Sequence, residues 1–251
     1  MRVSPSIPAI LAPLCLALSW VLCADPIPFA AIAATMAADS MPPDRDMPVY
    51  KPPKGTAPRS RIDDGIRGSP GHEPTIVALV PDHVGFTIKK DPTLYWYLHR
   101  VMPLPVRFTL IDSRSIRPII EVMLSPPTRP GVQRVPLREF GITLDPGMQY
   151  RWYVSLVVDA NKPSGDLVTG GMIERVDFNE GSALGFPLDC EKDAVHRYAE
   201  AGLWYDAISC ISELIESNPH DALLRKQRAF LLHQIDLLDV DQPESRQNGH
   251  R

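Results

Sequence analysis

Several common catalytic and ligand-binding motifs are missing from this sequence. Its seven histidines include no pair at a metal-ligand spacing and no His-Glu-x-x-His, which argues against a zinc-hydrolase site. There is no Gly-x-Ser-x-Gly segment for a serine nucleophile and no glycine-rich loop for a phosphate group. The sequence therefore predicts no catalytic residue, no metal site and no cofactor.

The chain also lacks a strong excess of charge of one sign. Its formal net charge is -4 and its pI is about 6.0. This balance gives no electrostatic basis for binding nucleic acid or an anionic membrane surface. We expect no nucleic-acid partner.

Cysteine is scarce, with four residues in 251. Cys15 and Cys23 lie near the N-terminus, so Cys190 and Cys210 remain if that segment is removed. In an oxidising compartment such a pair is a candidate disulfide. On an antiparallel helical hairpin the two residues would be offset by about 6 Å along the axis, close to the limit for a bridge. The alternative is that both are small apolar core residues.

Residues 1–33 have the order of parts of a secretory signal peptide. Arg2 supplies a positive charge, an apolar run follows, and Ala31 and Ala33 offer a cleavage site. The apolar run is interrupted by prolines and is short for a hydrocarbon core of about 30 Å, which argues against a membrane-anchoring helix. A lipid anchor on Cys23 would need a small residue where Leu22 stands. We expect export to the periplasm or the extracellular space, with no stable membrane span after removal.

Two further segments are predicted to be disordered. Residues 34–74 contain eight prolines and no apolar periodicity, so they bury too little surface to offset the entropy lost on ordering. Their basic and acidic residues are mixed, which favours a solvated linker over a binding patch. The polar residues 239–251 are predicted to be a disordered tail.

Residues 75–187 contain short segments rich in β-branched and aromatic residues, separated by proline, glycine and aspartate. The predicted strands span residues 76–80, 94–98, 106–112, 119–124, 132–137, 148–159 and 171–177. Seven strands at this spacing predict an antiparallel β-sandwich of the immunoglobulin or fibronectin type. In the longest strand Tyr150 and Trp152 share one face with other apolar residues, and we predict a structural role for both.

The turn before this strand is more specific than the alternation. Leu144 stands six residues before Tyr150, across Pro146 and Gly147, which is the spacing of a tyrosine corner. This motif predicts that the Tyr150 ring lies in the core and that its hydroxyl group bonds to the upstream backbone. The alternative is an ordinary hairpin with a Pro-Gly turn.

The pattern becomes helical over residues 188–238, which makes the predicted fold α+β. The predicted helices are a hairpin, residues 189–202 and 203–217, and one further helix, residues 218–238. Asp189 and Asn218 are the predicted caps, Gly202 ends the first helix, and Pro219 begins the third. One hairpin buries too little of its own apolar surface, so we predict that it docks on the sandwich with Trp204 inside.

The joint between the first two helices resembles a single tetratricopeptide unit. Its glycine, aromatic, alanine and closing proline fall at the spacings of that repeat. The matching residues are Gly202, Trp204, Ala207, Ile208, Ile211, Leu214 and Pro219.

Four motifs in order resemble an exported, largely cyanobacterial protein family known only as a domain of unknown function. They span residues 78–81, 91–97, 144–152 and 202–207. The resemblance covers roughly residues 70–235. The chain departs from it at Val158-Asp159, where members often carry Cys-Asp. The resemblance implies an exported domain over this range and implies no activity.

Aromatic side chains raise two interpretations. Period two along residues 94–98 puts Trp96 on the face opposite Tyr95 and Tyr97. The tyrosines, with Trp204 and Tyr205 of the helical segment, could form an interface between sheet and helices. Alternatively, Tyr95, Tyr97 and Tyr205 form a surface that binds carbohydrate or peptide.

From these observations we expect a non-catalytic binding or structural module of the cell envelope, with a protein or polysaccharide partner. The alternative hypothesis is an exported hydrolase whose carboxylates meet only in the folded chain. The candidate carboxylates are Asp82, Asp91, Asp112, Glu121 and Asp159. Two of them about 5 to 10 Å apart in one cleft would favour the hydrolase.

Overall fold

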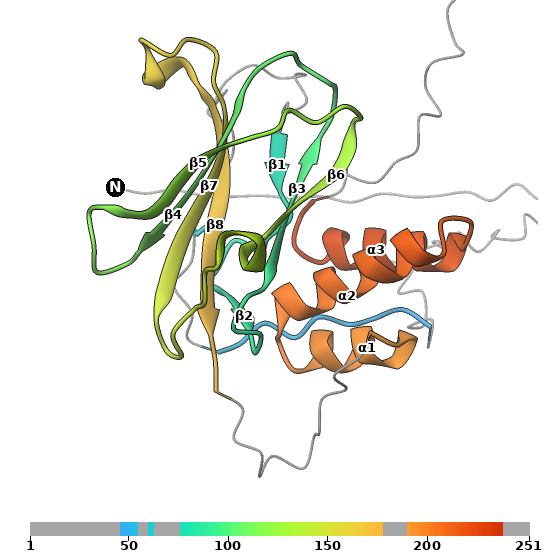
Figure 1. The fold of residues 1–251 in the computed structure, drawn as a ribbon. Coiled ribbons are helices and arrows are strands. Elements are labelled where there is room, and N and C mark those ends of the chain that lie inside the picture. Colours follow the sequence, from blue (N-terminus) through green and yellow to red (C-terminus); the bar gives the residue numbers. More distant parts are fainter. Residues whose placement is uncertain (1–45, 55–59, 63–75, 178–189, 238–251) are drawn as a thin grey trace, which may run out of the picture. The chain divides into compact units, whose positions relative to one another are not determined.

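A computed structural model describes residues 46–54, 60–62, 76–177 and 190–237. These residues belong to one compact unit, residues 43–251, with a mixed α+β fold of two sheets followed by three helices (Figure 1). The strands are β1 (Ile76–Ala78), β2 (Gly85–Thr87), β3 (Thr93–Leu98), β4 (Val106–Asp112), β5 (Pro118–Leu124), β6 (Gly131–Pro136), β7 (Gln149–Leu156) and β8 (Leu167–Arg175). The helices are α1 (Lys192–Glu200), α2 (Trp204–Ser217) and α3 (Ala222–His233), with short 3-10 helices at Leu137–Phe140 and Pro163–Gly165.

The strands form a three-stranded sheet, in the order β1-β3-β6, and a five-stranded sheet, in the order β2-β8-β7-β4-β5. Strand β2 pairs with β8 in parallel, so the prediction of a purely antiparallel arrangement is wrong there. Strand β2 has only three residues, too few to show an alternating pattern. Strand β8 begins at Leu167, where a loop was expected, because Thr169 and Gly170 conceal the alternation of its first half.

Strands β4 and β7 form the centre of the five-stranded sheet. Their register places Phe108 opposite Val154 and Leu110 opposite Trp152, and all four side chains are buried. Strand β3 is central in the other sheet, and both of its faces are covered, since Leu94, Tyr95 and Trp96 are all buried. One face meets the five-stranded sheet, and α2 packs on the other.

Helix α2 is tied to the sheets by three hydrogen bonds from buried aromatic residues. The Trp204 indole N–H donates to the carbonyl oxygen of Leu79 at 2.8 Å. The Tyr205 hydroxyl accepts from the Trp152 indole N–H at 2.9 Å and donates to the carbonyl oxygen of Met172 at 3.0 Å. The helical segment therefore contributes side chains to the interior of the sheets.

Gly202 ends α1 in the left-handed region, with φ of 75°. Its amide donates to Ala199 at 3.1 Å, and the amide of Leu203 donates to Tyr198 at 2.9 Å, both to carbonyl oxygens. This pair of bonds is a Schellman motif, which favours glycine at the left-handed position. A Cβ atom at this position would also lie 2.9 Å from the Lys51 carbonyl oxygen.

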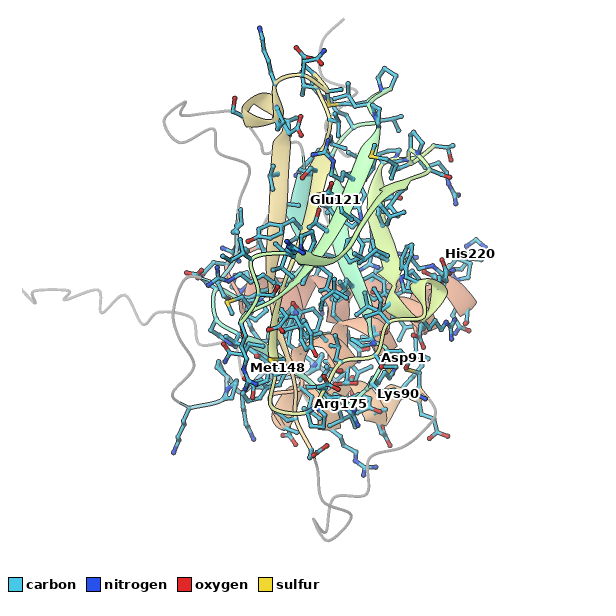
Figure 2. The ribbon with its side chains drawn as sticks, turned by 60° about the vertical axis from the view of Figure 1, so that its left-hand side comes forward. Lys90, Asp91, Glu121, Met148, Arg175 and His220 are labelled. Atoms are coloured by element: carbon cyan, nitrogen blue, oxygen red, sulfur yellow. The ribbon has the colours of Figure 1, made fainter. Side chains whose placement is uncertain are left out.

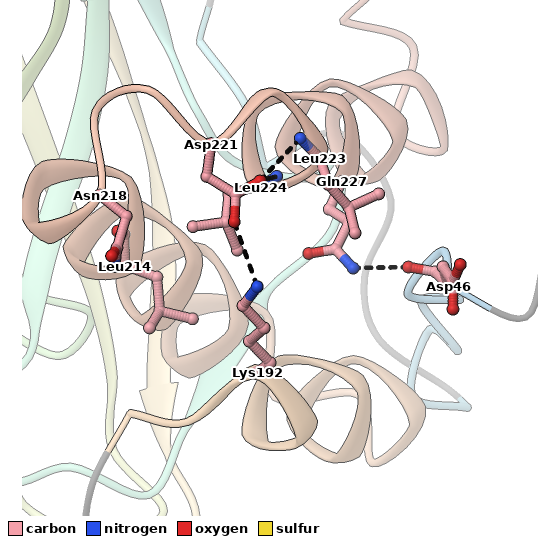
Figure 3. A network of polar contacts seen from close by, with 8 residues as sticks. All are labelled: Asp46, Lys192, Leu214, Asn218, Asp221, Leu223, Leu224 and Gln227. Atoms are coloured by element: carbon pink, nitrogen blue, oxygen red, sulfur yellow. Dashed lines mark hydrogen bonds and ion pairs between the residues drawn. The ribbon is translucent and has the colours of Figure 1, made fainter.

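The start of the third helix differs from the prediction. Helix α3 begins at Ala222, and Asp221 is its cap, accepting from the amides of Leu223 and Leu224 (Figure 3). Asn218, the predicted cap, instead follows the end of α2 and donates from its side chain to the carbonyl oxygen of Leu214 at 3.1 Å. Asp221 also pairs with Lys192 at 3.1 Å, and this ammonium lowers the pKa of the Asp221 carboxyl. The Asp221 carboxylate thus accepts from two backbone N–H groups of the helix and pairs with a cation, whereas the neutral side chain of Asn218 could not form the ion pair.

The interpretation of residues 34–74 as a linker is wrong for residues 46–54 and 60–62. The Tyr50 ring lies edge-on against Trp204 with 4.9 Å between ring centroids, and the Tyr50 amide donates to the Gln234 side chain at 2.8 Å. Gln227 donates to the carbonyl oxygen of Asp46 (Figure 3). Ile62 forms an antiparallel bridge with Gly170 of β8. The predictions for residues 1–33 and 239–251 and the cap at Asp189 lie outside the described residues.

The Tyr150 ring is buried at the start of β7, and its hydroxyl accepts a hydrogen bond from the amide of Asp145 at 2.9 Å. Gly147, in the turn between them, has φ of 68°. These are the contacts of a tyrosine corner: a core ring and a hydroxyl bonded to the upstream backbone.

Replacing Tyr150 with phenylalanine is expected to lower the free energy of unfolding by about 1 to 3 kcal/mol, because the Asp145 amide loses its acceptor. Urea unfolding measures the change. Tyr153→Phe is the matched control, since Tyr153 lies on the opposite face of the same strand, and its effect is expected to be within about 0.5 kcal/mol. Equal stability of the Tyr150 variant and the parent would show that the hydroxyl contributes nothing.

Candidate functional site

The three tyrosines considered for a binding surface lie at the junction of sheet and helices. Tyr95 and Tyr205 are each 1 % exposed, and the hydroxyl of Tyr205 is bonded to Trp152 and Met172. Burial raises the pKa of Tyr95 to about 12, which keeps its phenol protonated. Tyr97 is half-buried and lies edge-on to His99, with ring centroids 4.9 Å apart. The interpretation that all three residues form a binding surface is therefore wrong, because Tyr95 and Tyr205 are part of the core.

The candidate carboxylates of a hydrolase are spread over the sheets. Asp112 lies opposite Tyr150 at one end of β7, while Asp159 follows Leu156 at the other end, so about 20 Å of strand separates them. Each accepts from a nearby turn amide: Asp112 from Arg114 at 2.6 Å and Asp159 from Asn161 at 2.9 Å. Both carboxylates therefore have local structural roles.

The remaining candidates lie on other parts of the fold. Figure 2 shows Asp91 and Glu121 well apart, with Glu121 on β5 of the five-stranded sheet. Asp82 is exposed between β1 and β2. Within the described ranges there is also no group of three or more histidines, cysteines, aspartates or glutamates placed to hold a metal ion.

A pocket of about 390 Å³ lies where the two sheets meet beside strands β5 and β6. We call it the edge pocket. Its apolar lining comes from Trp96, Val106, Met123, Leu124, Pro127, Val135 and Phe140. Its polar lining comes from Ser125, Gln133, Arg134 and Glu139. A concave site lined by both apolar and polar residues is a candidate binding site.

The polar residues of the edge pocket are held by local contacts. Gln133 donates from its side chain to the carbonyl oxygens of Arg129 and Gly131, at 3.0 and 3.2 Å, which fixes the turn before β6. Arg134 pairs with Glu216 of α2 at 3.4 Å, and both side chains are about half exposed. Such a pair contributes little to stability and leaves the guanidinium accessible.

Strand β5 is the last strand of its sheet, and no described strand pairs with its outer side. The direction of its backbone groups follows from β4. Val157 donates to Pro105, and Ser113 donates to Gln149, so odd-numbered residues of β4 bond to β7 and even-numbered ones bond to β5. The partners of the even-numbered residues are the even-numbered residues of β5. The amides and carbonyls of Glu121 and Met123 consequently face the open side.

Apolar side chains are concentrated on the same hairpin. Ile116 at its tip is 98 % exposed, and Ile119 and Met123 on β5 are 49 % and 51 % exposed. Exposed apolar residues that cluster along a sheet edge indicate an interaction surface.

The first half of β5 is protected from strand addition. Pro118 has no amide hydrogen to donate, and the register with β4 shifts next to it, between Leu110 and Ile111. Both features are known devices for blocking an edge. The accessible part of the edge is therefore the second half, Glu121 and Met123, which is also the part beside the edge pocket.

The sequence analysis did not find the edge pocket. Its lining comes from β3, β4, β5, the loop after β5, β6 and the 3-10 helix after β6, and only the tertiary fold brings these segments together. One signal was available: in the sequence of β5 both faces carry apolar residues around a single glutamate. A strand with two apolar faces is either fully buried or an exposed apolar edge.

Together, the fold and the edge pocket define a two-sheet α+β protein with an accessible sheet edge. The chain belongs to the family described as Domain of Unknown Function (DUF928), which matches residues 55–244. Comparisons with curated proteins and with solved structures found no match. No helix in the described part of the chain is long and apolar enough to cross a membrane.

Proposed function

We propose that this protein is an exported, non-catalytic binding module of the cell envelope and that the edge pocket with the second half of β5 is its binding site. The observation that supports this proposal is the coincidence of three features at one place: outward backbone groups, exposed apolar side chains and a pocket lined by both apolar and polar residues. Export rests on the signal-peptide pattern of residues 1–33.

The partner that fits this site is an extended protein segment. A strand added beside β5 would bond to the backbone of Glu121 and Met123, and alternate side chains of that strand would point toward the edge pocket. An apolar side chain suits the Trp96 and Leu124 lining, and Glu139 offers a negative charge to a neighbouring residue of the partner. A polysaccharide would use the pocket but not the backbone groups.

We also propose that the two sheets form a sandwich of the immunoglobulin or fibronectin type. The chain crosses from one sheet to the other after β1, β2, β3, β5 and β6, as it does repeatedly in Greek-key sandwiches. The hydroxyl of Tyr150 accepts its hydrogen bond at the start of β7, the strand that follows the last crossing. The α1–α2 hairpin, with its Schellman turn at Gly202, is proposed to be a single tetratricopeptide-like unit used for packing.

The competing hydrolase hypothesis has weaker support at this site. Glycoside hydrolysis needs two carboxylates about 5 to 10 Å apart. Among the described residues that line the edge pocket, Glu139 is the one carboxylate. The site therefore has the composition of a binding pocket and lacks an acid–base pair.

Selection from a displayed library of short peptides on the purified chain tests the binding proposal. We expect enriched peptides to share an apolar residue and to bind Met123→Lys at least about tenfold more weakly than the parent, because the substitution replaces an exposed apolar side chain of the β5 edge with a charged one. Leu223→Lys is the matched control, since Leu223 is a partly exposed apolar residue on α3.

Peptides that bind the parent, Met123→Lys and Leu223→Lys equally would place binding elsewhere. If no peptide is enriched, and an envelope polysaccharide binds the parent but not Met123→Lys, the partner is a polysaccharide and not a protein. Hydrolysis of that polysaccharide, abolished by Glu139→Gln, would support the enzyme hypothesis instead.

Export has its own measurement. Intact-mass analysis of the protein from the periplasm or the medium is expected to give a chain that begins near Ala34. A soluble full-length chain confined to the cytoplasm would contradict it.

A further inference from the structure

Two cysteines lie together at the start of the helical segment. Cys190 is half-buried just before α1, and Cys210 is fully buried in α2. The Cys210 Sγ atom lies 3.9 Å from the carbonyl oxygen of Glu191, the residue next to Cys190. The Cys190 thiol is within hydrogen-bonding reach of the Cys210 thiol. Both thiols are free in this structure.

The position of this pair differs from the one that the sequence suggested. Helix α1 begins at Lys192, so Cys190 precedes the helix, and the helical rise per residue does not fix its position relative to Cys210. The residue instead approaches α2 from the segment that enters the helix. The axial offset expected for two cysteines on paired helices therefore does not apply here, and it no longer argues against a disulfide.

We propose that Cys190 and Cys210 form a disulfide bond in the exported protein. The bond would join the entry of α1 to the middle of α2 and close a loop that contains α1 and the turn at Gly202. This proposal rests on the proposed export, because disulfides persist in oxidising compartments.

The reaction is a thiol–disulfide exchange with a dithiol oxidant in its disulfide form. The Cys190 thiolate attacks one sulfur of the oxidant, whose disulfide bond breaks to give a mixed disulfide and one free thiol on the oxidant. The Cys210 thiolate then attacks the Cys190 sulfur and releases the second oxidant thiol. The two cysteines lose two protons and two electrons, and the oxidant gains them.

The order of attack follows from exposure. Cys190 is the accessible thiol, whereas the hydrogen bond with Cys190 and then burial raise the pKa of the Cys210 thiol. A buried neutral thiol is a poor first nucleophile. Cys190 therefore forms the mixed disulfide, and Cys210 resolves it.

The test uses the full chain with Cys15→Ser and Cys23→Ser, so that only this pair remains. The reduced protein is treated with oxidised glutathione, free thiols are blocked with iodoacetamide, and peptides are mapped by mass. We expect one linked peptide pair containing Cys190 and Cys210, and a Tm about 5 to 10 °C higher than that of the reduced chain.

Single variants identify the pathway. Cys210→Ser is expected to trap glutathione on Cys190, and Cys190→Ser is expected to leave Cys210 unmodified in the folded chain. Alkylation of both cysteines after oxidation, or disulfide-linked dimers in place of the internal link, would overturn the proposal. The location of the protein is measured separately. Protein that is found only in the cytoplasm but forms the Cys190–Cys210 bond in vitro would contradict export and still support the pairing of the two cysteines.

Discussion

Replacing Trp204 with alanine is expected to lower the free energy of unfolding by about 3 to 5 kcal/mol. Trp204 has no exposed surface, its indole N–H donates to the Leu79 carbonyl, and its ring packs against Tyr50. The substitution opens a cavity between helix and sheet and leaves the Leu79 carbonyl without this donor. Because sheets and helices share one core, calorimetry is expected to show a single transition at a lower temperature.

Trp204→Phe separates the two contributions. Phenylalanine retains most of the packing but donates no hydrogen bond, so this variant is expected to lose about 1 to 3 kcal/mol of the free energy of unfolding. Two separate transitions in Trp204→Ala, with the sheets melting at the parent temperature, would show that the helices are an independent module.

The second large expected effect is a dependence of stability on pH through Asp206. This carboxyl is fully buried in the first turn of α2, where Oδ2 accepts from the Ile88 amide at 3.0 Å. Burial raises its pKa from 3.8 to about 6, although Lys89 and the hydrogen bonds from Ile88 and Thr87 favour the charged form. Tyr198 also faces it.

The sign follows from the raised pKa. The folded chain holds the Asp206 proton more tightly than the unfolded chain, so the resulting stability is fully present below about pH 3.8 and is lost as the pH rises through about 6. The total loss is about 3 kcal/mol. Urea unfolding of the parent and of Asp206→Asn from pH 4 to pH 7 measures it as the difference between the two curves. Parallel curves would mean that Asp206 titrates normally in the folded chain.

The sequence predicted strands well where β-branched and aromatic residues are bounded by proline, glycine or aspartate. Strands β3, β4 and β5 lie close to their expected positions, and in β4 the alternation of side chains also defines the buried face. The Gly202 turn was also predictable, since a left-handed helix end favours glycine locally. These features depend on short-range chemistry.

The features that sequence analysis missed depend on distant partners. Met47 and Tyr50 are isolated apolar residues among prolines, and their burial requires helices that follow about 150 residues later. Strand β2 exists because β8 offers it an edge. The edge pocket likewise needs six segments to meet, so the pattern of β5 could indicate an apolar edge but not the pocket beside it.

The packing of residues 46–54 changes where a minimal folded fragment must begin. The match to the family begins at residue 55, after Tyr50 and after the amide of Lys51, which donates to the carbonyl oxygen of Ala199 at 3.0 Å. A fragment cut at that boundary would uncover one side of Trp204 and release the Gln234 side chain from Tyr50 and Pro48. The residues that the family matches and the residues that pack together are therefore offset at the N-terminal side, and expression boundaries are best taken upstream of Asp46.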